Sequence, residues 1–117
     1  MAEELSRSLL ELIHASIPTF QAAEALLFLA THRDRDFSVD EIVVGMRPRI
    51  IAVAAMQEYG ALFATRHLVT ERSGRFKYAP ASGELERSVC ELQHAYNERP
   101  VTLIITIYHV ARGSFQP

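Results

Sequence analysis

Three cations flank a predicted tight turn in the middle of the chain. Arg72, Arg75 and Lys77 lie around Ser73-Gly74, and short alternating segments on either side are typical of a β-hairpin. A hairpin projects from a fold, and these cations have few acidic neighbours in the sequence, so they could hold phosphate groups. The alternative is that the charges keep an exposed hairpin soluble and block edge-to-edge pairing.

Two further arginines precede a long apolar segment that begins at Ile50. Arg47 and Arg49 flank Pro48, close to a predicted helix N-terminus, where amide groups attract anions. Residues 47–77 carry six basic and two acidic side chains, a net charge of +4, although the whole chain has −2. This asymmetry is what a domain with one anion-facing side would show. Solvated arginines in an exposed turn are an equally good interpretation.

The predicted helix after Arg49 contains few groups that could read a base sequence. Direct readout needs Arg, Lys, Asn or Gln side chains aimed at base edges. Within residues 50–59 only Gln57 and Tyr59 qualify, and Glu58 would face phosphates unfavourably unless it reads a cytosine. The segment is otherwise apolar and rich in alanine.

Cys90 and His94 are the candidate metal ligands, because side chains four residues apart share one face of a helix. Two ligands do not complete a site, and no matching pair is evident elsewhere in the sequence. Cys90 is more simply interpreted as a small buried hydrophobe. No nucleophile elbow, phosphate loop or dinucleotide fingerprint is present. We therefore expect no cofactor, no metal and no enzymatic activity.

Apolar periodicity predicts the elements that position these residues. Helices are expected over residues 5–17, 18–31, 39–46 and 50–67, and another is expected after Ser82. Ser38 to Glu41 forms a capping box, with Phe37 placed to pack against Ile42. We expect Gly60 to allow the close approach of another helix. The charged residues 32–36 are expected to form a solvated connection.

The segment Pro100–Ala111 is compatible with both a strand and a helix. Two patterns overlap in this segment: an alternation typical of a strand, formed by Val101, Leu103, Ile105 and Ile107, and a helical stripe, formed by Val101, Ile104, Ile107, Tyr108 and Ala111. Pro100 at a first helical position favours the helix, and the β-branched content favours the strand.

The size and composition of the chain indicate one domain in a reducing compartment. Its 117 residues are enough to bury a core, and no apolar run approaches the roughly 18 residues that a membrane span needs. A single cysteine excludes an internal disulfide and fits the cytoplasm.

The stretch from Phe37 to Tyr78 resembles a winged helix-turn-helix domain of bacterial regulators similar to the MarR and ArsR groups. Residues 38–42 match the first helix, 56–63 part of the second, and 72–78 the wing. His67-Leu68-Val69 stands where such proteins usually read Gly-Leu-Val or Gly-Leu-Leu. Residues 96–102 resemble a C-terminal element of small bacterial winged-helix proteins. The resemblance spans residues 18–80, and it implies DNA binding as a dimer, with the second helix in the major groove.

The expected fold is therefore mainly α with a small β-hairpin. It comprises a winged helix-turn-helix core, residues 18–80, between an N-terminal helix, residues 1–17, and a C-terminal helical extension, residues 81–112. In the first functional hypothesis the protein is a cytoplasmic transcription regulator that binds duplex DNA. The expected DNA-binding residues are Arg47, Arg49, Gln57, Tyr59, Arg72, Arg75 and Lys77.

The terminal helices would join two copies into a homodimer, because they carry clean apolar stripes outside the core. One stripe lies in residues 5–17, and the other is formed by Leu85, Val89, Leu92 and Tyr96. The alternative hypothesis is a winged-helix protein-interaction module without sequence-specific DNA binding. A third is a ligand- or metal-sensing regulator that acts through Cys90 and His94.

Overall fold

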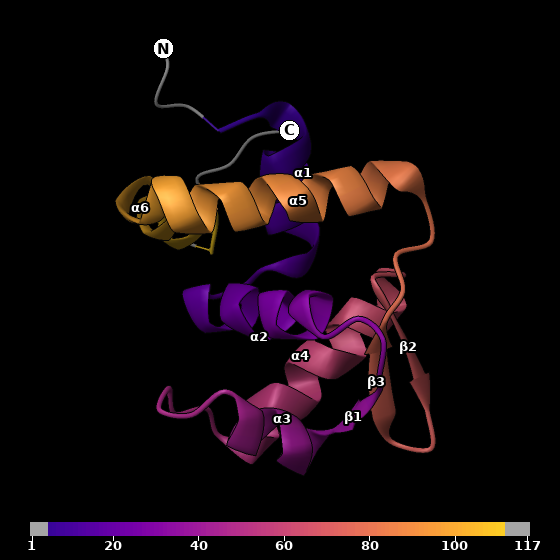
Figure 1. Cartoon of the computed structure of the whole chain (residues 1–117). Coiled ribbons are helices and arrows are strands. Elements are labelled where there is room, and N and C mark those ends of the chain that lie inside the picture. The colour runs from indigo at the N-terminus through magenta and orange to yellow at the C-terminus, as the bar shows by residue number, and fades with distance from the viewer. Residues whose placement is uncertain (1–4, 112–117) are drawn as a thin grey trace. The chain divides into compact units, whose positions relative to one another are not determined.

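The computed structural model describes residues 5–111, and within them the chain is mainly helical with a small antiparallel sheet (Figure 1). This confirms the expected fold class. The chain divides into two compact units. Unit 1 comprises residues 1–23 and 82–117, and unit 2 comprises residues 24–81. The outermost residues of the expected terminal segments, 1–4 and 112–117, lie outside the described range.

Unit 1 is built from helices α1 (Arg7–Ser16), α5 (Gly83–Glu98) and α6 (Pro100–Ala111), together with the start of α2 (Phe20–Thr31). α1 contacts both α5 and α6, and α5 contacts α6. Serine side chains cap two of the helices: Ser6 accepts from the Leu9 N–H (3.2 Å) and Ser82 from the Leu85 N–H (3.1 Å). The buried apolar side chains of these three helices include Leu9, Leu12, Ile13, Val89, Leu92, Ala95, Leu103 and Ile107.

The ambiguous C-terminal segment is a helix over its whole length. Of the alternating residues, Leu103 and Ile107 are buried and Val101 and Ile105 are largely exposed, so the four do not share one face as they would in a strand. The helical period therefore decides which side chains enter the core of unit 1, as Pro100 at the first helical position suggested.

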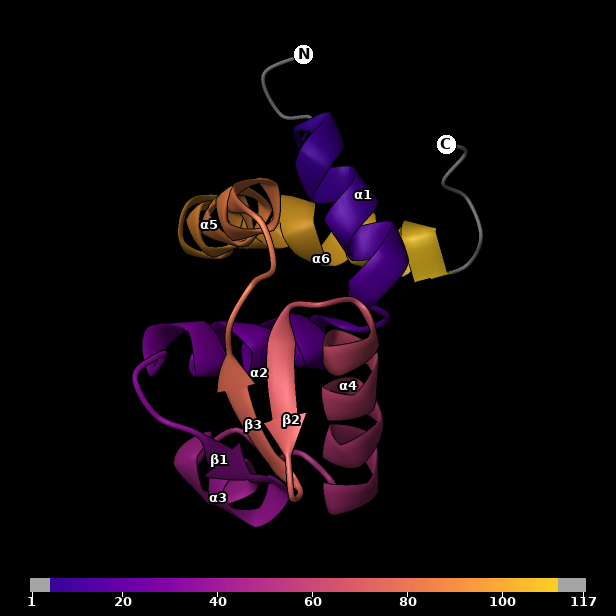
Figure 2. The same ribbon diagram turned by 90° about the vertical axis from the view of Figure 1, so that its right-hand side faces the viewer.

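Unit 2 contains the rest of α2, β1 (Phe37–Ser38), α3 (Val39–Gly45), α4 (Val53–Thr65), β2 (Val69–Arg72) and β3 (Arg75–Tyr78). The strand order is β1-β3-β2, and both pairings are antiparallel. Figure 2 shows β2 running beside α4, and these two elements are in contact. The predicted hairpin is confirmed, whereas the two-residue strand β1 was not expected.

Backbone conformation explains the two sharp turns of unit 2. Ser73 and Gly74 both have positive φ, 55° and 78°, which lets the hairpin follow the right-handed twist of its strands. His67 also has a positive φ of 64° at the end of α4. It therefore adopts the left-handed conformation that glycine most readily takes, and the Leu68 N–H donates to the Phe63 carbonyl (2.9 Å).

The predicted start of α3 is confirmed in detail. The Ser38 side chain accepts from the Glu41 N–H (3.1 Å), and the Glu41 carboxylate accepts from the Ser38 N–H (3.0 Å). Two backbone N–H groups that have no partner within the helix are thereby satisfied. Phe37 and Ile42, on either side of this capping box, are buried.

Three helices begin later than the sequence predicts, and the first of them, α1, starts at Arg7 rather than Leu5. α2 starts at Phe20 rather than Pro18, because the Thr19 side chain caps it by accepting from the Ala22 N–H (3.0 Å). α4 starts at Val53 rather than Ile50. Ile51 is buried while Ile50 is 88% exposed, so the chain passes this point in a non-helical path that anchors Ile51 in the core.

Gly60 makes room for an aromatic ring of the sheet, not for another helix as expected. A Cβ atom at this position would lie 2.7 Å from Cζ of Phe76, a buried residue of β3. The absence of a side chain at Gly60 therefore lets the hairpin pack directly on the backbone of α4.

Within residues 5–111, no single helix is both long and apolar enough to cross a membrane. By length and composition alone, only α1 and α2 taken together as a bent pair would pass.

We expect Gly60→Ala to lower the free energy of unfolding. This exchange stabilises an ordinary helix by about 1 kcal/mol, but here the methyl group must displace the Phe76 ring, and overpacking costs about 1–3 kcal/mol. Chemical denaturation of the variant measures the difference. Gly83→Ala is the matched control, because an added Cβ there meets nothing within 4 Å. A Gly60→Ala variant as stable as this control would contradict the assignment.

Candidate nucleic-acid interface

All seven expected DNA-binding residues lie in unit 2, on three different segments. They comprise Arg47 and Arg49 between α3 and α4, Gln57 and Tyr59 on α4, and Arg72, Arg75 and Lys77 on the hairpin. Each side chain can contact a nucleic acid only if it points toward solvent and is not already bound by other groups of the protein.

The register of the hairpin places its cations on one face. Arg72 pairs with Arg75 and Thr70 with Lys77, and side chains two residues apart on a strand share a face. Phe76 belongs to the opposite face and is buried. The solvent side of the hairpin is therefore the basic side.

Arg75 is nevertheless bound by carboxylates of its own unit. Its Nε donates to Oδ1 of Asp36 (2.9 Å), and its Nη2 donates to Oε1 of Glu41 (2.8 Å). The expectation that the hairpin cations have few acidic neighbours is wrong for this residue. A phosphate would have to compete with both carboxylates for the same donors.

The contacts with Arg75 help to lower the pKa values of Asp36 and Glu41. The hydrogen bond from Arg75 is the main cause that holds the pKa of Asp36 below its ordinary value. The backbone N–H of Ser38, followed by the charge of Arg75, lowers the pKa of Glu41. The pKa of Arg75 is raised in return, chiefly by its hydrogen bond to Asp36. All three groups remain partly exposed, so solvent screens their attraction.

Arg49 is also turned toward the protein. Its Nε donates to the Met46 carbonyl (3.3 Å), and its Nη1 lies 3.8 Å from Oε2 of Glu24, a mostly buried carboxylate on α2. Arg47, Arg72 and Lys77 are exposed. Arg49 is exposed too, with 46% of its side chain accessible, but Arg47, Arg72 and Lys77 are the expected cations that these ion pairs do not engage.

The solvent-facing side of α4 carries no cation. Its exposed residues from Val53 onward are Val53, Ala54, Gln57, Glu58, Ala61 and Thr65. Of the two expected base-reading residues, Gln57 lies on this face, whereas Tyr59 is half-buried. Glu58 supplies the only formal charge of the face, and it is negative.

The acidic residues of unit 2 offset most of the positive charge of residues 47–77. Unit 2 contains eight Lys and Arg residues and seven Asp and Glu residues, a net charge of +1, compared with +4 for residues 47–77. The carboxylates of Glu24, Asp36 and Glu41, which are distant in sequence, lie against Arg49 and Arg75.

The segment 32–36 is more than a solvated connection. Asp36 binds Arg75, the Arg33 guanidinium lies 4.9 Å from the centre of the Tyr78 ring, and the Arg35 guanidinium lies 4.3 Å from that of Phe37. These contacts hold the segment against the sheet. The sequence analysis did not identify Asp36 as a partner of the hairpin. The only signal for this role was the alternation of arginine and aspartate in residues 33–36.

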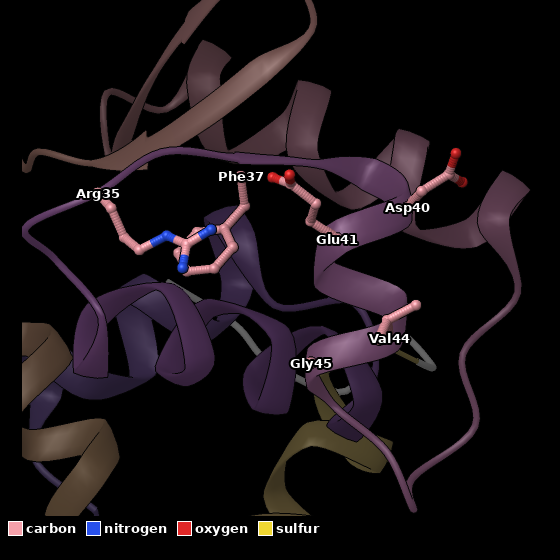
Figure 3. A pocket seen from close by; sticks show the side chains of 6 residues that line it. All are labelled: Arg35, Phe37, Asp40, Glu41, Val44 and Gly45. Atoms are coloured by element: carbon pink, nitrogen blue, oxygen red, sulfur yellow. The ribbon is translucent and has the colours of Figure 1, made fainter.

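A shallow pocket of about 390 Å³ lies on the side of α3 (Figure 3). Its lining consists of Arg35, Phe37, Asp40, Glu41, Val44 and Gly45. Figure 3 shows the Arg35 side chain over the Phe37 ring, and Asp40 and Val44 projecting together from α3. Two carboxylates make this pocket a poor phosphate site, and it includes none of the expected DNA-binding residues.

Cys90 and His94 share one face of α5, and both line a second cavity, of about 320 Å³, in unit 1. Cys90 is exposed, so its interpretation as a buried hydrophobe is wrong, and its Sγ lies 3.6 Å from a carboxylate oxygen of Glu86. Across residues 5–111, no group of three or more His, Cys, Asp or Glu side chains is placed to hold a metal ion.

Comparisons of the chain with protein-family models, with curated proteins and with solved structures each found no match.

We expect Arg75→Gln to raise the pKa of Asp36 more than that of Glu41, because Glu41 keeps its backbone hydrogen bond. Both pKa values are lowered in the native state, so the stabilisation they provide is present above the ordinary values of 3.8 and 4.5. It is lost as the pH falls through the native pKa values. The variant should therefore be less stable than wild type near neutral pH, and its stability should approach that of wild type at an acidic pH below the native pKa values of both carboxyl groups.

Carboxyl-carbon NMR titration reports the two pKa values, and denaturant unfolding at the two pH values reports the stability. Arg72→Gln is the control, because Arg72 faces solvent on the same side of the hairpin. Unchanged pKa values for both carboxyl groups in Arg75→Gln would contradict the assigned network.

Proposed function

We propose that this chain is a cytoplasmic bacterial winged-helix module that binds another protein and has no catalytic role. The order α2, α3, α4 and hairpin, with β1 added to β3, supports the winged-helix assignment. One fold can host many functions, so the exposed surface of unit 2 indicates the function better than the fold does.

The solvent-facing side of α4 and the residues just before it carry this proposal. Ile50 is 88% exposed and Val53 is 43% exposed at the N-terminal end of α4, and exposed alanines continue the face. Aliphatic side chains can contact little of a base beyond the thymine methyl group. They gain much more from burial against the apolar surface of a protein.

The charge on this face indicates the chemistry of the partner. Glu58 lies among Ala54, Gln57 and Ala61 on the exposed side of α4. A complementary surface therefore presents apolar side chains with a lysine or arginine opposite Glu58. The same carboxylate repels a nucleic-acid backbone.

Duplex DNA binding in transcription regulation is the second candidate, and the exposure of Arg47, Arg72 and Lys77 favours it. Contacts from these residues would hold phosphates and carry little sequence information, because Gln57 alone is placed for base readout. Three phosphate contacts predict a log-log dependence of affinity on salt with a slope of about −2.7.

Glu58→Lys separates the two functions, because it changes them in opposite directions. We expect it to weaken protein binding by placing like charges together, whereas it would tighten DNA binding and steepen the salt slope by about 0.9. A photoreactive benzoylphenylalanine in place of Ile50 measures the first effect, through the yield of protein crosslinked in the source cells. Anisotropy of a fluorescent duplex at about 50 mM salt measures the second.

Glu58→Gln is the matched control, because it removes the charge at similar size. The interaction module is supported by a discrete crosslinked protein whose yield falls from wild type through Glu58→Gln to Glu58→Lys. Duplex binding that tightens in the same order, and is lost in a variant with Arg47, Arg72 and Lys77 replaced by alanine, would overturn it in favour of DNA binding.

A further inference from the structure

Helix α6 exposes a continuous apolar stripe on the side that faces away from the core of unit 1. Val101, Ile104, Ile105 and Tyr108 are 66%, 44%, 50% and 57% exposed. Their spacing of three, one and three residues places them on one face of the helix. Isolated exposed aliphatic residues are common, but four on one face of a twelve-residue helix form a patch.

The terminal stripes expected to join two copies are occupied within the chain. Leu9, Leu12 and Ile13 of α1, and Val89 and Leu92 of α5, are buried, and α1 contacts α5. Among α1, α5 and α6, the apolar surface still open to a second copy is therefore on α6, whose helical stripe through Val101, Ile104 and Tyr108 was not expected to join two copies.

The stripe is symmetric about its own midpoint. Its centre falls between Ile104 and Ile105, and Val101 and Tyr108 lie at equal distances on the two sides. When two copies of such a helix pack antiparallel around a two-fold axis, each Ile104 meets an Ile105, and each Val101 meets a Tyr108. All four positions then bury apolar surface at once.

The absence of charge on α6 also favours a second copy as the occupant. Pro100–Ala111 contains no Lys, Arg, Asp or Glu residue. Charged groups near a two-fold axis meet their own copies and repel, so an uncharged face is suited to self-pairing. Nothing on this helix would select a partner of opposite charge.

We propose that α6 packs antiparallel against α6 of a second copy of this chain, with Ile104 and Ile105 at the centre. The paired face is about 18 Å long and about 10 Å wide. That is well below the roughly 800 Å² per partner of a standard interface, so the dimer is weak, with a dissociation constant of micromolar or higher. The inference does not depend on the function proposed for unit 2.

Sedimentation velocity on the whole chain from about 10 µM to about 1 mM tests the proposal. The wild-type mass should rise from monomer to dimer across this range. Ile104→Glu and Ile105→Lys should each raise the dissociation constant at least about tenfold, because every dimer then buries two unpaired charges. Asn97→Glu and Asn97→Lys are the controls, since they make the same charge changes at an exposed position on α5.

Mixing the two variants tests the register. In the antiparallel pair, the carboxylate introduced by Ile104→Glu in one chain faces the ammonium group introduced by Ile105→Lys in the other. A one-to-one mixture should therefore recover dimers that neither variant forms alone. Circular dichroism confirms that each variant is folded. A wild-type chain that stays monomeric, single variants that dimerise like wild type, or a mixture without recovery would each overturn the proposal.

Discussion

The carboxylate of Glu41 holds unit 2 together at the point where a helix meets the sheet. One of its oxygens, Oε1, accepts hydrogen bonds from the Ser38 N–H (3.0 Å) and from Nη2 of Arg75 (2.8 Å). The first bond closes the capping box of α3, and the second holds β3 beside β1, where Ser38 and Arg75 are paired in register. One acidic side chain therefore links the start of α3 to the hairpin, together with the Asp36–Arg75 ion pair and the pairing of β1 with β3.

This arrangement has a direct consequence for the surface. An arginine that already binds two carboxylates gains little from a phosphate, because binding would exchange one set of charge-assisted hydrogen bonds for another. Arg75 is in this position, and Arg49 approaches it through Glu24 and the Met46 carbonyl. The exposed face of α4 is itself aliphatic and weakly acidic. The carboxylates that stabilise unit 2 and a bound phosphate would thus compete for the same arginine side chains.

Unit 1 solves a different problem, because α6 is apolar on two sides. Leu103 and Ile107 are buried in the unit, whereas Ile104 and Ile105 on the other side face solvent. A helix of this kind reaches its lowest free energy only when both sides are covered. Val101 and Ile105, two of the residues whose alternation resembled that of a strand, belong to the exposed stripe.

Local signals in the sequence determined much of the architecture. The capping box at Ser38, the turn at Ser73-Gly74 and the periodicity of α1, α3 and α5 act over a few residues, so they can be read without the fold. The sequence predicts the N-termini of α2 and α4 two and three residues too early. The first is set by the Thr19 cap and the second by the burial of Ile51. The role of Gly60 was also missed, because its neighbour, Phe76, is sixteen residues away.

The tertiary structure alone decided the candidate site. Whether Arg75 is available depends on Asp36 and Glu41, which lie more than thirty residues before it in the chain. The charge of residues 47–77 could be counted from the sequence, but not the carboxylates that folding brings against them. Coulomb attraction depends on distance in space, whereas sequence analysis measures distance along the chain. The sequence by itself therefore determined most of the elements, apart from β1 and the choice between strand and helix for Pro100–Ala111. The structure determined which charges those elements leave for a partner.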